Sequence, residues 1–224
     1  MNKEDNLKEK FKQALISTVR VISDDYKLEK EEKKNLSSKN YNFFELDNLN
    51  NKNDYIKLRA EADSEALKRK FSNKKIYEKN LPKNSSCRSL YDVSEKIRYE
   101  ILGTKILKGI SKNLKDNYSN KVLLKRKDQL KSKEDVQVVE AFELFMLKNF
   151  LGIKLNTLSE KILSYWQEEF ESSFKNHLSY LMENIENQEK FNSKLSEILQ
   201  QMKIFDSEND EQDQDNKEND NLNY

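Results

Sequence analysis

Turn-forming residues are almost absent from this chain, which has one proline, Pro82, and three glycines in 224 residues. Multi-stranded β folds place such residues at their many tight turns. Here the apolar residues recur instead at steps of three and four, between polar faces rich in lysine, glutamate and asparagine. That spacing is typical of amphipathic helices. We therefore predict an all-α protein, an elongated bundle of about five to six helices.

Changes in composition divide the chain into segments. Residues 206–224 carry eight acids, one lysine and no recurring apolar residue, so we predict a disordered acidic tail with the chemistry of a linker. The stretch before residue 54 is polar apart from the first helix and one aromatic knot. The predicted segments are an N-terminal helix 1–23, a polar connector 24–53, a helical domain 54–205 and the tail 206–224.

Within the helical domain, the apolar spacing predicts individual helices and their ends. Gly152 is expected to end one of them, and Thr157-Leu158-Ser159-Glu160 reads as a capping box that starts the next. Residues 72–86, which contain Pro82, are expected to form a loop. The predicted helices are 54–71, 89–116, 136–150 and 158–185, with a segment 191–202 that continues the last helix or folds back on it.

Two of the three glycines, Gly103 and Gly109, lie inside the predicted helix 89–116. Each costs about 1 kcal/mol of helix stability relative to alanine. A helix that carries two such residues is expected to need them for close approach of a neighbouring backbone. We therefore predict tight helix packing at both positions.

The residue types needed for catalysis or metal binding are scarce. The single histidine, His177, has no cysteine or acid at metal-ligand spacing, and no glycine-rich phosphate loop occurs. Cys87 is the single cysteine, which excludes an internal disulfide and favours an inert thiol in a reducing compartment. No secretory signal or membrane-spanning stretch is seen, so we expect a cytoplasmic protein without a membrane partner.

Polar residues on the predicted helices 54–71 and 89–116 are candidates for structural ion pairs or for contacts with a partner. Glu95 and Arg98 are three residues apart, which permits an ion pair within one helix. If Arg98 instead faced the other helix, a buried pair with Asp63 would fix the packing register at a desolvation cost. The candidate structural or partner-contact residues are Arg59, Asp63, Ser64, Arg88, Glu95, Arg98, Glu100, Gly103, Gly109 and Asn113.

Several of these residues fall in short ordered motifs. Residues 59–67 (RAEADSEAL), 88–91 (RSLY), 95–103 (EKIRYEILG) and 107–114 (LKGISKNL) follow one another in the sequence. In this order they resemble motifs of the CobT-type subunit of aerobic cobaltochelatase. The resemblance covers most of residues 7–205, although 24–54 match poorly.

The sequence also departs from that family. Phe71-Ser72 stand where the family usually has His-Asp. Family members continue past an acidic linker into a von Willebrand A domain with an Asp-x-Ser-x-Ser motif, and this sequence contains no such motif. The resemblance is therefore to the amino-terminal helical module, and it implies a tethering role for the acidic tail.

By this resemblance, the chain is a non-catalytic adaptor in an ATP-dependent protein complex. It would couple an AAA+ ATPase ring to the large chelatase subunit, and the complex would insert cobalt into hydrogenobyrinic acid a,c-diamide during cobalamin biosynthesis. No cofactor is expected on this chain, because the resemblance places ATP, Mg and cobalt on the partner subunits.

Three alternatives stay open at this point. The chain could be an adaptor of an AAA+ partner that serves another client. It could be a basic helical nucleic-acid-binding protein, because residues 105–133 carry ten bases and two acids, although a solvated face explains such a strip more simply. It could also be a structural coiled-coil protein built on the apolar stripe of residues 158–202.

Overall fold

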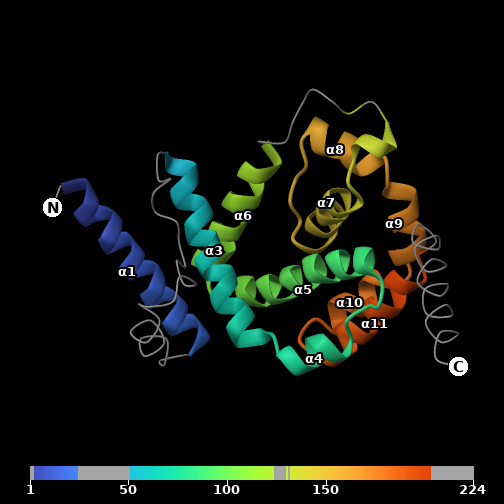
Figure 1. Ribbon diagram of the computed structural model, residues 1–224, viewed down its shortest axis with the longest axis horizontal. Helices are drawn as coiled ribbons and strands as arrows, with labels where there is room; N and C mark the ends of the chain where they lie inside the picture. The colour runs from blue at the N-terminus through green and yellow to red at the C-terminus, as the bar shows by residue number, and fades with distance from the viewer. Residues whose placement is uncertain (1–2, 25–50, 124–129, 131, 203–224) are drawn as a thin grey trace, which may run out of the picture. The chain divides into compact units, whose positions relative to one another are not determined.

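The computed structural model describes residues 3–24, 51–123, 130 and 132–202. Every regular element in these ranges is helical, which confirms the predicted all-α class (Figure 1). Among them, no helix combines the length and the apolar character needed to cross a membrane. Most of the predicted connector 24–53 and the whole acidic tail 206–224 lie outside the described residues.

The chain forms two compact units. Unit 1 comprises Met1–Ser72 and Tyr99–Leu124, and unit 2 comprises Asn73–Arg98 and Lys125–Tyr224. Helix α5, Ser85–Ile106, belongs to both, because the boundary between the units falls between Arg98 and Tyr99. Residues 54–205 therefore contribute to both units.

Unit 1 is built from α1 (Lys3–Ser23), α3 (Lys52–Phe71), the last turns of α5 and α6 (Lys108–Leu123). Both α1 and α6 pack against α3, as Figure 1 shows. Small residues on α3 allow α1 to come close. The core between the two helices contains Leu15, Val19, Leu58, Ala62 and Ala66.

Helix α3 begins two residues before the predicted position because an asparagine caps it. The side chain of Asn51 accepts a hydrogen bond from the backbone N–H of Asp54 (3.2 Å). In return, the Asp54 carboxylate accepts one from the N–H of Asn51 (3.0 Å). This reciprocal capping box satisfies backbone donors that would otherwise lack partners at the first turn.

The prediction of one continuous helix over 89–116 was wrong, because the chain breaks at Leu107 into α5 and α6. The break loses little hydrogen bonding, since Leu107 N–H still donates to Gly103 O (3.3 Å) and Leu107 O accepts from Ser111 N–H (3.2 Å). Beyond the break, Ile110 and Leu114 pack with Leu67 of α3 in one buried cluster. The gain from that burial favours the change of direction.

The two helical glycines have different surroundings. A Cβ at Gly103 would lie 2.3 Å from Cδ1 of Leu67, which is buried, so tight packing is confirmed there, although the neighbour is a side chain and not a backbone. At Gly109 a Cβ would meet nothing within 4 Å, so the same prediction was wrong for that residue. Gly109 is the second residue of α6 and is exposed.

Unit 2 surrounds an aromatic core. Phe142 of α7 lies 5.3 Å from Phe170 and 5.5 Å from Phe174 of α9, measured between ring centroids, and all three side chains are fully buried. Helix α11 folds back to pack on α9 and α10, one of the two predicted possibilities. Besides residues 85–98 of α5, the elements are α4 (Lys74–Lys79), the short 3₁₀ helix η2 (Lys133–Asp135), α7 (Val138–Phe150), α8 (Thr157–Ser164), α9 (Gln167–Phe174), α10 (Leu178–Glu183) and α11 (Gln188–Gln200).

Helix ends in unit 2 differ from the predicted positions at two places and agree at a third. Helix α4 occupies part of the predicted loop 72–86, and Asn73 caps it through hydrogen bonds from the N–H groups of Lys75 and Ile76. The cap of α8 is Asn156, whose side chain accepts from Ser159 N–H, one residue before the predicted capping box. Gly152 has a φ of +63° immediately after the C-cap of α7, as expected for a helix-ending glycine.

The predicted helix 158–185 was wrong because it is three helices, α8, α9 and α10. Its apolar stripe advances mostly in steps of four, and in a helix of 3.6 residues per turn each such step overshoots a full turn by about 40°. Over five steps the stripe of a straight helix would rotate by about 200° and leave the core. Interruptions near Trp166 and His177 return the apolar residues to the interior.

The glycine contacts predict opposite effects of two identical substitutions. Gly103→Ala should destabilise unit 1 by about 1–3 kcal/mol, because the new methyl group overlaps a buried leucine. Gly109→Ala should be neutral or stabilise by up to about 1 kcal/mol, because its Cβ enters open space. Urea unfolding followed by circular dichroism measures both, and equal effects of the two substitutions would contradict the packing described.

Candidate docking groove

Unit 1 carries a cavity of about 430 Å³, lined by the end of α1, the middle of α3 and the start of α6. Four of the residues predicted from the sequence meet in its wall, and they come from two helices. These residues are Arg59, Asp63, Gly109 and Asn113. We call this cavity, with its lining residues, the groove.

Large apolar side chains line the groove and reach solvent. Val21 of α1 is 66% exposed, and Leu107, at the break between α5 and α6, is 49% exposed. Ile106 beside Leu107 is 52% exposed. Neighbouring apolar side chains left in solvent mark surfaces that bind other molecules. In one continuous helix 89–116, Leu107 would lie on the same face as the buried residues Ile110 and Leu114, and the helix break is the reason that it lies outside.

A carboxylate forms the polar floor of the groove. Asp63 is 1% exposed, and its Oδ2 accepts a hydrogen bond from Nδ2 of Asn113 (2.6 Å). Arg59, one turn earlier on α3, places its Nε 3.9 Å from Asp63 Oδ1, and its side chain remains 41% exposed. Burial raises the pKa of Asp63 above 3.8, although the Asn113 hydrogen bond and the Arg59 charge oppose the shift. Ionised Asp63 therefore costs folding free energy.

A second buried carboxylate joins three helices of unit 1. Glu100 of α5 is 1% exposed and accepts hydrogen bonds from Ser64 Oγ of α3 and from the Tyr118 hydroxyl of α6, both at 2.6 Å. The two hydroxyl groups thus supply charge-assisted hydrogen bonds to the buried Glu100 carboxylate. Ser64 and Glu100 were predicted, whereas Tyr118 was missed. Tyr118 lies four residues after Leu114, so periodicity indicates that it is buried but does not identify its partner.

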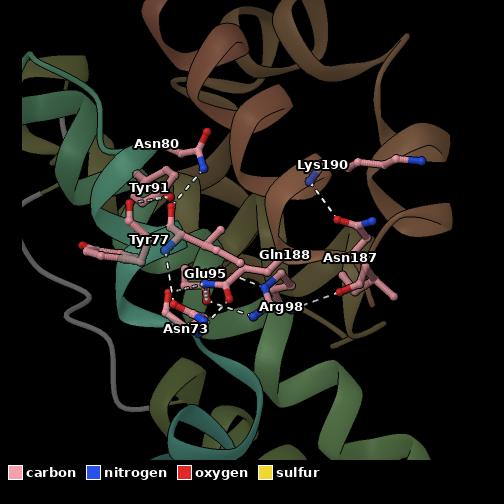
Figure 2. Close-up of polar contacts among 11 residues, drawn as sticks. Asn73, Tyr77, Asn80, Tyr91, Glu95, Arg98, Asn187, Gln188 and Lys190 are labelled. Carbon is pink, nitrogen blue, oxygen red and sulfur yellow. Dashed lines mark hydrogen bonds and ion pairs between the residues drawn. The ribbon is translucent and has the colours of Figure 1, made fainter.

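A polar network in unit 2 contains the Glu95–Arg98 pair (Figure 2). Arg98 is 1% exposed, and its Nε and Nη2 donate to the two carboxylate oxygens of Glu95 at 2.8 and 2.9 Å. Its Nη1 donates to the backbone oxygen of Ile185 (3.2 Å). Arg98 thus forms the pair within its own helix, whereas Asp63 is bound by Asn113 of unit 1.

Gln188, at the start of α11, extends this network. Its Nε2 donates to Glu95 Oε1 (3.0 Å), and its Oε1 accepts from the backbone N–H of Asn73 (2.7 Å). The first turn of α11 is thereby tied to α5 and to the residue that caps α4 (Figure 2). Sequence reasoning missed Gln188, because an isolated glutamine in a polar chain carries no signal. Arg88, also predicted, donates from Nε to the backbone oxygen of Pro82 (2.8 Å).

The candidate residues thus fall into two groups. Arg88, Glu95 and Arg98 belong to unit 2, and the other candidates belong to unit 1. Within unit 1, Asp63, Ser64, Glu100 and Gly103 are buried, whereas Gly109 is exposed. Whether any of them contacts a partner stays a prediction.

His177 lines a second cavity, of about 450 Å³, together with Glu169, Ser172 and Ser173. Within the described residues, no group of three or more His, Cys, Asp or Glu side chains could hold a metal ion. His177 occupies the N-cap position of α10 and is half-buried. The thiol of Cys87 is fully buried and donates to the backbone oxygen of Leu199 (3.4 Å).

The sequence matches the family described as Cobalamin biosynthesis protein CobT over residues 5–223. The chain belongs to the CobT family. The match confirms the resemblance carried by residues 59–114 and extends it through the poorly matching connector and the acidic tail. No solved structure matches this chain. Membership in the CobT family implies a cobaltochelatase subunit of cobalamin biosynthesis, working in a multi-subunit complex.

The buried pair gives a stability prediction for this CobT family member. Arg98→Met should cost about 3–5 kcal/mol, because Glu95 would stay buried without its cation. Adding Glu95→Met should restore much of that loss, since the uncompensated charge disappears as well. Arg88→Met, at an exposed arginine, should cost about 1 kcal/mol. Unchanged thermal and urea stability of the Arg98→Met protein would contradict the network described.

Asp63 gives a prediction about pH. Because burial raises its pKa in the folded protein, its contribution to stability is complete below pH 3.8 and is lost as the pH rises through the raised value. Asp63→Asn removes that loss. The difference in urea midpoint, variant minus unsubstituted protein, should therefore increase as the pH rises from 3.8 through the raised pKa of Asp63. Above that pKa the difference should stay constant. Asp116→Asn, at an exposed position of α6, is the control. A pH-independent difference for Asp63→Asn would contradict the assignment.

Proposed function

We propose that this chain is a non-catalytic adaptor module of an ATP-dependent aerobic cobaltochelatase. In this proposal it couples an AAA+ ATPase ring to the large chelatase subunit in the cytoplasm, and the assembly inserts cobalt into hydrogenobyrinic acid a,c-diamide. ATP and Mg bind to the ATPase, and the large subunit receives the corrinoid and the metal substrate. Membership in the CobT family is the general support for this role.

The observation that carries the adaptor role is the groove of unit 1. A subunit that works by binding others needs surface that is unfavourable in water until a partner covers it. Val21 and Leu107 provide such surface on two walls of one cavity. The Arg59 side chain, which is 41% exposed at the groove, adds a charge that distinguishes one partner from another.

Helix α5 suggests how binding could be transmitted. Its residues up to Arg98 are anchored in unit 2 through Glu95, and its residues from Tyr99 are anchored in unit 1 through Glu100. One helix therefore contributes residues to both units, and secondary-structure elements are among the features that carry coupling between sites. In the proposal, movements of the ATPase ring reach the chelatase by this route.

Reconstitution with the ATPase and large subunits of the same host tests the proposed function. Cobalt insertion, followed through the absorbance of the corrin, should require all three proteins, ATP and Mg. The chain alone should neither hydrolyse ATP nor load the corrin. Sedimentation velocity should detect its complexes with the other two subunits.

Two results would change the conclusion. Insertion at the same rate without this chain would contradict the adaptor role. Binding of the ATPase without any binding of the large subunit would favour an adaptor for another client. The full chain is used in both assays, and Leu7→Asp, an exposed change outside the groove lining, controls for general surface effects.

A further inference from the structure

We infer that the groove binds an acidic amphipathic segment of a partner subunit, most simply a helix. Apolar side chains of that segment enter between α1 and α6, and its carboxylates meet Arg59 and the lysines beside the groove. The inference rests on the proposed function, because it specifies the chemistry of the surface that the adaptor recognises.

The size and the exposed apolar walls of the groove favour an apolar face on its occupant. Its volume of about 430 Å³ lies within the range of clefts that bury most of a ligand. Val21 and Leu107 leave 66% and 49% of their surfaces in solvent at its walls. Apolar grooves between helices bind amphipathic helices through anchors spaced by one helical turn. Such an occupant would bury Val21 and Leu107 together.

The charged side chains that reach solvent at the groove are basic. Among the residues that the structure describes, Asp63 is the one acid in the groove lining, and at 1% exposure it is covered. Arg59 keeps 41% of its side chain exposed, although its Nε is buried 3.9 Å from Asp63 Oδ1. Lys108 and Lys112, next in sequence to the lining residues Gly109 and Asn113, are exposed. The accessible charge at the groove is therefore positive.

An acidic occupant satisfies this arrangement better than a basic one. A carboxylate on the occupant pairs with the exposed part of the Arg59 side chain and with Lys108 or Lys112 in charge-assisted contacts. A lysine or arginine on the partner would face Arg59, Lys108 and Lys112 without reaching Asp63, and like charges in contact oppose binding. A nucleic acid would satisfy the cations but would leave Val21 and Leu107 in water.

The first experiment removes the apolar walls. The double variant Val21→Asp, Leu107→Asp is measured by biolayer interferometry against the purified ATPase subunit and against the purified large subunit. Its affinity for one of them should fall at least ~10-fold, as expected for central anchors of an interface. Leu7→Asp is the matched control, because Leu7 is an equally exposed apolar residue of α1 (62%) outside the groove lining. Its affinity should stay within ~2-fold of the unsubstituted chain.

The second experiment tests the sign of the charge. Arg59→Gln with Lys108→Gln should weaken the same complex ~10-fold and make its affinity less dependent on salt. The control pair, Lys57→Gln with Lys68→Gln, removes two exposed charges of α3 outside the groove lining and should change little. Circular dichroism of every variant checks that the helices are retained.

The outcomes separate this inference from the proposed function. If the unsubstituted chain binds a subunit and the apolar double variant binds it equally well, the groove is overturned while the adaptor role stands. If the apolar variant fails but the Arg59, Lys108 variant binds normally, the acidic character of the occupant is overturned. If the chain binds neither subunit, both proposals fail. Binding of duplex DNA is the last outcome. If DNA binds the unsubstituted chain and the apolar double variant equally, but not the Arg59, Lys108 variant, the inference of an acidic protein occupant is overturned.

Discussion

Three buried charged side chains on α5 organise this structure. Glu95 and Arg98 neutralise each other inside unit 2, and Glu100 is satisfied by two hydroxyl groups inside unit 1. A charge is removed from water only where such partners are in place, so each one specifies the position of the elements that supply them. Through these partners, α5 determines where α3 and α6 pack in unit 1 and where α11 begins in unit 2. The groove exists because α6 is held against α3 in this way.

Much of the helical content follows from apolar periodicity alone. The helices α1, α3, α7 and α11 lie close to where steps of three and four predict them. The breaks between α5 and α6 and between α8 and α9 do not follow from periodicity, because the apolar pattern continues through Leu107 and Trp166. At such positions the direction of the chain is set by tertiary burial, which the sequence pattern does not encode. A glycine within a helix predicted close packing correctly at Gly103, which lies against the Leu67 side chain. The same prediction failed at Gly109, where a Cβ would meet nothing within 4 Å.

Four residues of the groove were singled out from the sequence, but the groove itself was not predicted. Arg59, Asp63, Gly109 and Asn113 were singled out through family motifs, and the structure brings them together in one wall. Val21 and Leu107 were not recognised as surface residues, because periodicity places an apolar residue on a face without saying whether another element covers that face. Tyr118 and Gln188 were missed because the value of a buried hydrogen bond depends on a partner from a distant segment.

The burial of Cys87 has a practical consequence. Its thiol, the single one in the chain, is closed off from solvent beneath the end of α11. Reagents that label accessible sulfur should therefore leave the natural protein unmodified. A cysteine introduced at the surface would then be the one thiol that reacts. Two introduced cysteines, one in each unit, would carry a pair of spin or fluorescent labels. Such labels would report the distance between the two units with and without a bound partner.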